Sequence, residues 1–205
     1  MDDPAQAAAR GPALGLVETS SIARGVVAID AALKRSPAIL VSSKAVSGGK
    51  HLACFEGGVA EVGEAMAAAR AAAGALLLDD LELPLAAEPL WAMLRALGGE
   101  ALPPSWSDDA DAEAVALVET QTVCSALRAA DAACKATDVA IRDTRLAFDL
   151  AGKALFTMTG ALHAIEAAAA AAASAAEAGR PGAAGLVLLE VIAQPAPELR
   201  GRLFR

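Results

Sequence analysis

Few side chains in this sequence could do chemistry, and a recurring glutamate is the most prominent of them. Glu18 and Glu119 occupy the same position of a repeated Leu-Val-Glu-Thr tetrapeptide. Two such carboxylates could share general acid–base catalysis if the fold brought them together. Because the whole tetrapeptide recurs, we favour a structural interpretation, in which each glutamate makes hydrogen bonds that position the turn after it.

The histidines and cysteines do not form a recognisable metal or redox motif. His51 and His163 are isolated at non-equivalent positions, so neither a metal site nor an acid–base role is expected of them. The odd set Cys54, Cys124 and Cys134 has no Cys-x-x-Cys spacing and is interpreted as packing residues in a reducing compartment. The chain also lacks GxGxxG, P-loop, nucleophile-elbow and HExxH motifs, so we do not expect an enzyme.

Composition excludes several partners. The 205 residues carry a net charge of −8 without any basic stripe, which argues against binding to nucleic acid or an anionic membrane surface. An alanine run at 167–173 lies between Glu166 and Glu177, far short of the ~20 apolar residues that a membrane span requires. The start, Met1-Asp2-Asp3-Pro4, does not resemble a signal peptide, so a cytoplasmic location is expected.

An internal repeat organises the chain. Leu16–Thr19 recurs at 117–120, a displacement of 101, and nine of the 29 positions from 16 to 44 are identical under this shift. A two-residue insertion in the second copy then changes the displacement to 103, so Gly49-Lys50 meets Gly152-Lys153. The sequence therefore holds two copies of one domain.

Each copy has the same predicted order of elements. In the first copy we expect strands at 13–19, 38–46, 51–55 and 75–83, and helices at 21–36 and 59–73. Ser47-Gly48-Gly49 would form the hairpin between the second and third strands. The order β-α-β-β-α-β predicts an α+β chain of two tandem ferredoxin-like domains.

The first helix of each copy shows an apolar stripe that is expected to face the core. Its members are Ile22, Val26, Ile29 and Leu33 in the first copy and Val123, Leu127, Ala130 and Cys134 in the second.

Composition also sets the domain boundaries. We predict a flexible N-terminal tail at 1–12, a first domain at 13–98, a linker rich in Gly, Pro and acidic residues at 99–113, and a second domain at 114–205. Short additional helices are expected at 88–97 and at 197–203. Trp106, in the linker, could pack onto either domain.

Several segments together resemble the bacterial microcompartment shell domain. They are Leu14-Gly15-Leu16-Val17-Glu18-Thr19, the Asp-Ala-Ala-x-Lys helix end, the glycine-containing hairpin before Lys50, and Gly57-Gly58-Val59-Ala60-Glu61-Val62. Two unpermuted copies are similar to the tandem-domain shell proteins, whose three chains form a flat pseudohexagonal tile. The resemblance implies a homotrimer in a cytoplasmic organelle shell, in lateral contact with other shell proteins.

The resemblance also implies site residues. The family's pore hairpins correspond to Ser47, Gly48 and Gly49 in one copy and to Phe148, Asp149, Leu150 and Ala151 in the other, around a pore for small metabolites. Lys34 and Lys135 correspond to tile-edge lysines that pack against neighbouring tiles, although a cation at a helix end also complements the helix dipole. The family often has Arg-Pro after its final strand, where this chain has Leu83-Pro84 and Gln194-Pro195.

Thr19-Ser20-Ser21-Ile22-Ala23-Arg24-Gly25 further resembles the propanediol-utilisation branch of the family, which holds an iron–sulfur cluster at its pore. Ser47 stands where that branch has its pore cysteine and is a poor ligand for such a cluster, so no cofactor is expected. Two alternatives stay open: a redox conduit with a metal cluster at the pore, and a free ferredoxin-like trimeric regulator that binds a small effector.

Overall fold

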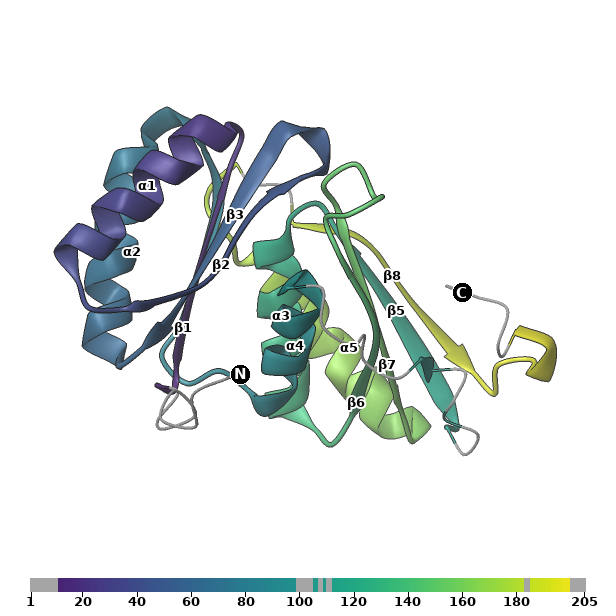
Figure 1. Cartoon of the computed structure of the whole chain (residues 1–205). Coiled ribbons are helices and arrows are strands. Elements are labelled where there is room, and N and C mark those ends of the chain that lie inside the picture. The colour runs from purple at the N-terminus through teal and green to yellow at the C-terminus, as the bar shows by residue number, and fades with distance from the viewer. Residues whose placement is uncertain (1–10, 99–104, 107–108, 110–111, 183–184, 200–205) are drawn as a thin grey trace, which may run out of the picture. The chain divides into compact units, whose positions relative to one another are not determined.

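The structure is a computed structural model that describes residues 11–98, 105–106, 109, 112–182 and 185–199. Contacts divide these residues into two compact units: the residues up to Ala45 with Gly49–Ala86, and Val46–Gly48 with the residues from Ala87 onward. Each unit contains one copy of the repeat as a four-stranded antiparallel sheet with two helices (Figure 1). The predicted tail lies almost wholly outside the described residues.

The elements of the two units correspond one to one. The first unit contains β1 (Ala13–Thr19), α1 (Ile22–Arg35), β2 (Ile39–Val46), β3 (Lys50–Gly57), α2 (Val59–Ala73) and β4 (Leu77–Leu83). The second contains β5 (Ala114–Thr120), α4 (Val123–Ala136), β6 (Ala140–Leu146), β7 (Ala154–Gly160), α5 (Leu162–Glu177) and β8 (Leu186–Ala193). The strand orders β2-β3-β1-β4 and β6-β7-β5-β8 are the ferredoxin-like order, so the predicted fold is confirmed.

Local sequence signals explain the helix boundaries. Ser21 caps α1 because its side chain accepts a hydrogen bond from the Arg24 N–H, and Thr122 caps α4 in the same way from the Ser125 N–H. The first helix ends at Arg35, two residues before Pro37, which cannot continue a helix. None of the described helices is long and apolar enough to span a membrane.

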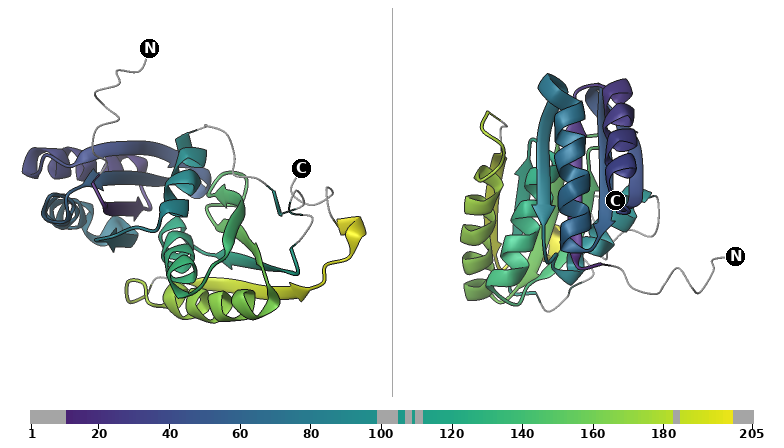
Figure 2. Two further views of the ribbon diagram at one scale, coloured as in Figure 1. Left: turned by 90° about the horizontal axis from the view of Figure 1, so that it is seen from below. Right: turned by 90° about the vertical axis from the view of Figure 1, so that its left-hand side faces the viewer.

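The helices cover one face of each sheet. In the first unit α1 and α2 lie side by side over the strands (Figure 2). Their common core consists of small and aliphatic side chains around a few large ones. The buried members include Val17, Ala28, Ala32, Phe55, Val62, Ala65 and Met66.

The apolar stripe predicted for α1 is partly wrong. Of its four members only Ile29 is buried, whereas Ile22, Val26 and Leu33 are exposed. The buried face of α1 instead carries Gly25, Ala28, Ile29 and Ala32. Small residues let the helix axis approach the sheet closely, which turns the larger members of the stripe outward. In α4 the corresponding Val123, Leu127 and Ala130 are buried and Cys134 is half-buried.

Gly25 shows how close this approach is. A Cβ atom at this position would lie 2.4 Å from Nδ1 and 2.7 Å from Cγ of the buried His51 ring in β3. The second unit has Ala126 and Ala154 at the equivalent positions, and both are buried. The two copies thus fill the same space differently, with glycine and histidine in one and two alanines in the other.

The two copies also differ in charge at equivalent positions. Arg70 in α2 binds Asp80 and Glu82 in β4, with Nε–Oδ2 and Nη2–Oε2 distances of 2.6 and 2.9 Å. The repeat places Ala173, Leu189 and Val191 at the equivalent positions, and the sheet register agrees, because Asp80 pairs with Val17 and Leu189 with Val118. The space between helix and sheet therefore holds ion pairs in the first unit and apolar side chains in the second.

The segment between the copies packs in the second unit. Helix α3 (Glu88–Gly98) contacts α4 and β6, although it follows the first copy in the chain and our sequence analysis assigned it there. Trp106 is buried in the same unit, where its backbone N–H donates to Asp143. Most of the predicted linker lies outside the described residues, as does the end of the helix expected at 197–203, of which Pro197–Leu199 form a short 3-10 turn.

Candidate functional site: the two hairpin loops

The first candidate loop is the turn between β2 and β3. Ser47, Gly48 and Gly49 form a short 3-10 turn, and the φ values of 78° at Gly48 and 71° at Gly49 lie in the left-handed region that favours glycine. Ser47 is half-buried, whereas both glycines are exposed. The loop thus presents peptide groups and one hydroxyl to solvent.

The second candidate loop, between β6 and β7, differs in size and chemistry. Phe148, Asp149 and Ala151 are exposed and Leu150 is half-buried. Asp149 and Ala151 have φ values of 58° and 51°, a region that disfavours residues other than glycine. Backbone hydrogen bonds close the loop, from the N–H of Ala147 to Lys153 O and from the N–H of Lys153 to Leu150 O. This loop presents an aromatic ring and a carboxylate.

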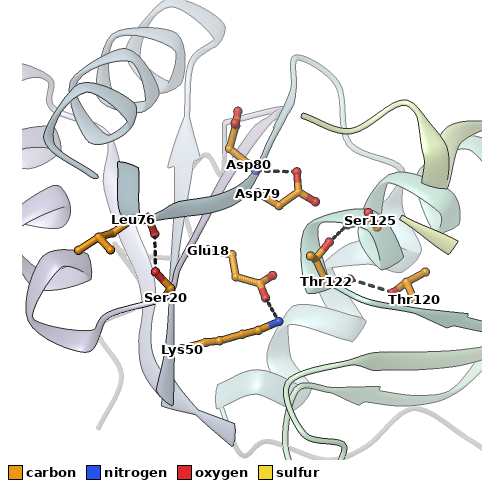
Figure 3. Close-up of polar contacts among 9 residues, drawn as sticks. All are labelled: Glu18, Ser20, Lys50, Leu76, Asp79, Asp80, Thr120, Thr122 and Ser125. Atoms are coloured by element: carbon orange, nitrogen blue, oxygen red, sulfur yellow. Dashed lines mark hydrogen bonds and ion pairs between the residues drawn. The ribbon is translucent and has the colours of Figure 1, made fainter. Parts of the chain in front are cut away.

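An ion pair stands at the base of each loop. Lys50 Nζ lies 2.8 Å from Glu18 Oε1 in the first unit (Figure 3), and Lys153 Nζ lies 3.1 Å from Glu119 Oε1 in the second. Lys50 is the first residue of β3 and Lys153 directly precedes β7, and each glutamate is the second-last residue of an inner strand, β1 or β5. Each ion pair therefore connects the end of a loop to an inner strand of its sheet.

These pairs sharpen the interpretation of the two glutamates. Each glutamate forms an ion pair with a lysine next to a hairpin loop, a partner that the sequence analysis did not single out, and the predicted positioning of the turn after the glutamate stays a prediction. The signal was present in the repeat, because Gly49-Lys50 and Gly152-Lys153 recur together. The two pairs differ in environment: Glu18 is fully buried, whereas Glu119 and Lys153 are each 39% exposed.

The predicted tile-edge lysines lie in the last turns of equivalent helices. Lys34 Nζ binds Asp30 Oδ2 at 2.7 Å and Lys135 Nζ binds Asp131 Oδ2 at 2.6 Å, each one helical turn away. Both lysine side chains are largely exposed, so the ion pairs fix their direction without covering them. Their contact with neighbouring tiles stays a prediction.

The cysteines lie outside both loops. Cys54 is buried in β3, where burial and the nearby charge of Glu56 raise its pKa far above the ordinary value. In α4 Cys124 is buried, and burial together with the charge of Asp131 raises the pKa of Cys134 to about 11. At Cys54 and Cys134 the thiolate, the form that binds metal, is therefore scarce at neutral pH.

The part of the chain that the structure describes offers no cluster of side chains for a metal centre. His51 Nε2 lies 3.1 Å from Ser43 Oγ, and burial lowers the pKa of the ring. Among the described residues no three histidine, cysteine, aspartate or glutamate side chains lie together closely enough to hold a metal ion.

The fold of both units is that of one protein class. The chain belongs to the BMC domain family, the bacterial microcompartment domain, which matches residues 13–84 and 114–195 and hence both sheet-and-helix copies. The prediction of two tandem domains of this family is thereby confirmed.

Two relatives are similar over most of the chain. The bacterial microcompartment shell protein PduT of Citrobacter freundii is 34% identical over 148 residues, which cover 72% of this chain and 76% of the relative. The crystal structure of a microcompartment protein from Desulfitobacterium hafniense DCB is 32% identical, with a TM-score of 0.72, and the match covers 91% of this chain and 97% of that one.

Proposed function

We propose that this chain is a structural subunit of a bacterial microcompartment shell and that three copies form a pseudohexagonal tile. The observation that carries the proposal is the pair of complete BMC domains in one chain. Three chains would supply six such domains, and a cyclic arrangement would close all head-to-tail interfaces within the ring. The similarity to the shell protein of Citrobacter freundii and to the microcompartment protein of Desulfitobacterium hafniense supports the same role.

The two hairpin loops would line a central pore in alternation. Three loops of Ser47, Gly48 and Gly49 would offer peptide groups and hydroxyls, and three loops of Phe148 to Ala151 would add rings and carboxylates. Pore-lining groups of this kind select by size, hydrogen bonding and charge. The pore would therefore pass small polar metabolites, and the groups that line it would repeat with threefold rather than sixfold symmetry.

The tile would meet other shell proteins along its edges. Lys34 and Lys135 are the proposed edge residues, because both are exposed and held in direction by an aspartate one turn earlier. The Arg-Pro sequence that often follows the last strand in the family is replaced here by Leu83-Pro84 and Gln194-Pro195. Lateral contacts would then depend more heavily on the two lysines.

The residues present do not fit an iron–sulfur cluster at the pore. Neither loop contains a cysteine, and the hydroxyl of Ser47 is a poor iron ligand. A pore without a cofactor is therefore proposed. Anaerobic reconstitution with iron and sulfide should give a featureless ultraviolet–visible spectrum, and a stoichiometric absorption band near 400 nm would favour a redox conduit.

Assembly of the purified protein tests the main proposal. Light scattering coupled to size exclusion should report a trimer, and electron microscopy should show flat sheets alone or with single-domain shell partners. The double variant Lys34→Ala/Lys135→Ala should keep the trimer and lose the sheets, whereas the control Arg180→Ala should keep both. Trimers that never join sheets or shells would favour an effector-binding regulator.

A further inference from the structure

His51 is a buried histidine next to the first candidate loop. It is the second residue of β3, so Lys50 alone separates it from the turn formed by Ser47–Gly49. The residue is 3% exposed and lies on the face of the sheet that the helices cover, because it pairs with Thr19, two residues along β1 from the core residue Val17. His51 therefore connects the loop to the interior of the first unit.

The two ring nitrogens of His51 have different surroundings. Nε2 lies 3.1 Å from Oγ of Ser43 in β2, so the ring bridges the two strands of the hairpin next to the loop. Nδ1 has no hydrogen-bond partner among the described residues and lies against α1, where a Cβ atom at Gly25 would approach it to 2.4 Å. A neutral ring suits this site, because its single N–H can be donated to Ser43 while Nδ1 carries no proton.

A protonated ring does not suit the same site. Protonation would put a second N–H on Nδ1, and a buried donor without an acceptor loses the hydrogen bond that it makes to water. Gly25 is the fourth residue of α1, so the positive end of the helix dipole also opposes a cation at this place. Burial lowers the pKa of His51, in agreement with this geometry. The closed hairpin therefore favours the neutral ring.

The charged side chains of the two helices in this unit have partners other than His51. Arg24 follows the first residues of α1, and its Nη1 donates to Ala72 O at the end of α2. The first turn of α1 contains no acidic residue. The other charged residues of the two helices bind one another, the N–H of Gly58 or β4, and they are Asp30, Lys34, Arg35, Glu61, Glu64 and Arg70.

The charged residues of the strands around His51 lie on the opposite face of the sheet. They are Glu18, Lys44, Lys50 and Glu56, and each is next in sequence to a residue on the helix-covered face. Lys50 and Glu18 bind each other at 2.8 Å. Titration of the ring is therefore governed by its burial rather than by a partner charge.

The hairpin that contains His51 lies at the edge of its sheet. Strand β2 is an edge strand that pairs with β3 in the described sheet (Figure 1). Every second residue of β2 is exposed, namely Ile39, Val41, Ser43 and Ala45. A segment with little buried surface opens at lower free energy than the inner strands do. A charge on His51 should therefore affect this hairpin before the rest of the unit.

The second copy has no histidine at this place. Ala154 stands at the position of His51 and Ala126 at that of Gly25, and both alanines are buried. The hairpin between β6 and β7 is thus an internal comparison without a titratable ring.

We propose that His51 makes the first candidate loop pH-sensitive: the neutral ring holds the β2–β3 hairpin closed, and protonation of the ring opens this hairpin locally. In the open hairpin the ring reaches water and has its ordinary pKa of 6.5, whereas in the closed hairpin the pKa is lower. The open form therefore takes up the proton first. Its population should rise by up to about tenfold for each pH unit below 6.5, until the closed form also titrates.

The proposal concerns the single chain and does not depend on the proposed tile. Within such a tile three of the six loops would respond to acid and three would not.

Hydrogen exchange followed by mass spectrometry tests the proposal. In peptides that span residues 42–52, protection relative to the intrinsic exchange rate at each pH should fall several-fold, and at most about tenfold, between pH 6.5 and pH 5.5. Peptides that span residues 144–154 of the same chain should keep their protection. In His51→Gln, whose amide can still bind Ser43 but does not titrate, the fall at 42–52 should disappear.

Three results would overturn the proposal. Protection at 42–52 that is independent of pH would show that the ring does not control the hairpin. An equal loss in both hairpins would show that acid destabilises the whole chain rather than this segment. A fall that persists in His51→Gln would assign the titration to another group. The comparison of the two hairpins needs no substitution, so it decides the question even if the variant does not fold.

Discussion

The contact between Gly25 and His51 makes a prediction that the structure allows to be worked out in detail. In Gly25→Ala the new Cβ would lie 2.4, 2.7 and 2.8 Å from Nδ1, Cγ and Cβ of His51, well inside van der Waals contact. The ring cannot move away freely, because it is buried and its Nε2 lies 3.1 Å from Ser43 Oγ. Either the helix or the ring must shift.

The expected magnitude combines two terms of opposite sign. Overpacking of a buried site costs about 1–3 kcal/mol, whereas replacing glycine by alanine inside a helix gains about 1 kcal/mol. Gly25→Ala should therefore lower the free energy of unfolding by roughly 0–2 kcal/mol. In a His51→Ala background the contacts with Nδ1 and Cγ are gone and the Cβ–Cβ approach of 2.8 Å remains, so the same substitution should lower the free energy of unfolding by less than it does in the parent chain. The second copy already has this alanine pair at Ala126 and Ala154.

A double-mutant cycle measures the part of the collision that the imidazole ring contributes. Urea unfolding followed by far-ultraviolet circular dichroism, at one protomer concentration, should give a coupling free energy of about 1–3 kcal/mol between the two sites. Gly63→Ala in α2 is the matched control, because its Cβ would meet only Glu82 Oε1, at 3.4 Å, and it should be neutral or stabilising. Effects of Gly25→Ala and His51→Ala that add to within about 0.5 kcal/mol would refute the steric argument.

Three further predictions concern charge and titration. Lys50→Met should cost more unfolding free energy than Lys153→Met, because it removes the lysine paired with the fully buried Glu18, whereas the half-exposed Lys153–Glu119 pair should contribute about 1 kcal/mol or less; equal losses in chemical denaturation would contradict this ranking. Burial lowers the pKa of His51 below 6.5, so the unfolded chain takes up a proton first and stability should fall as pH drops below 6.5; His51→Ala should flatten that slope, and an unchanged slope would count against it. With its pKa raised to about 11, Cys134 should react with iodoacetamide about ten times faster at pH 9 than at pH 8, whereas a rate independent of pH would contradict a protonated thiol.

The repeat made the fold predictable from the sequence. Each local signal could be checked against its equivalent in the other copy. The helix caps at Ser21 and Thr122 are one such pair, and the hairpin before Lys50 has its counterpart in the second copy. The predicted limits of β1 and α2, Ala13–Thr19 and Val59–Ala73, agree with the structure residue for residue. Strand order followed from the element order, because the split β-α-β arrangement leaves few alternatives.

The candidate site was only partly accessible to sequence reasoning. The two loops were located from the repeat and the family resemblance, and both lie between the strands expected. The partners of Glu18 and Glu119 were not found, because Lys50 and Lys153 are more than 30 positions away and come close only through the pairing of neighbouring strands. An ion pair of this kind is set by sheet register, which local patterns do not encode.

The sequence by itself determined the duplication, the element order and the chemical difference between the two loops. The tertiary structure decided which side of α1 is buried, where α3 and Trp106 pack, and which carboxylate holds the start of α3. The physical reason is that periodicity shows which residues share a face, but only packing shows what covers that face. On α1 the buried face carries Gly25, which lies against His51 of β3, whereas Leu33 is exposed.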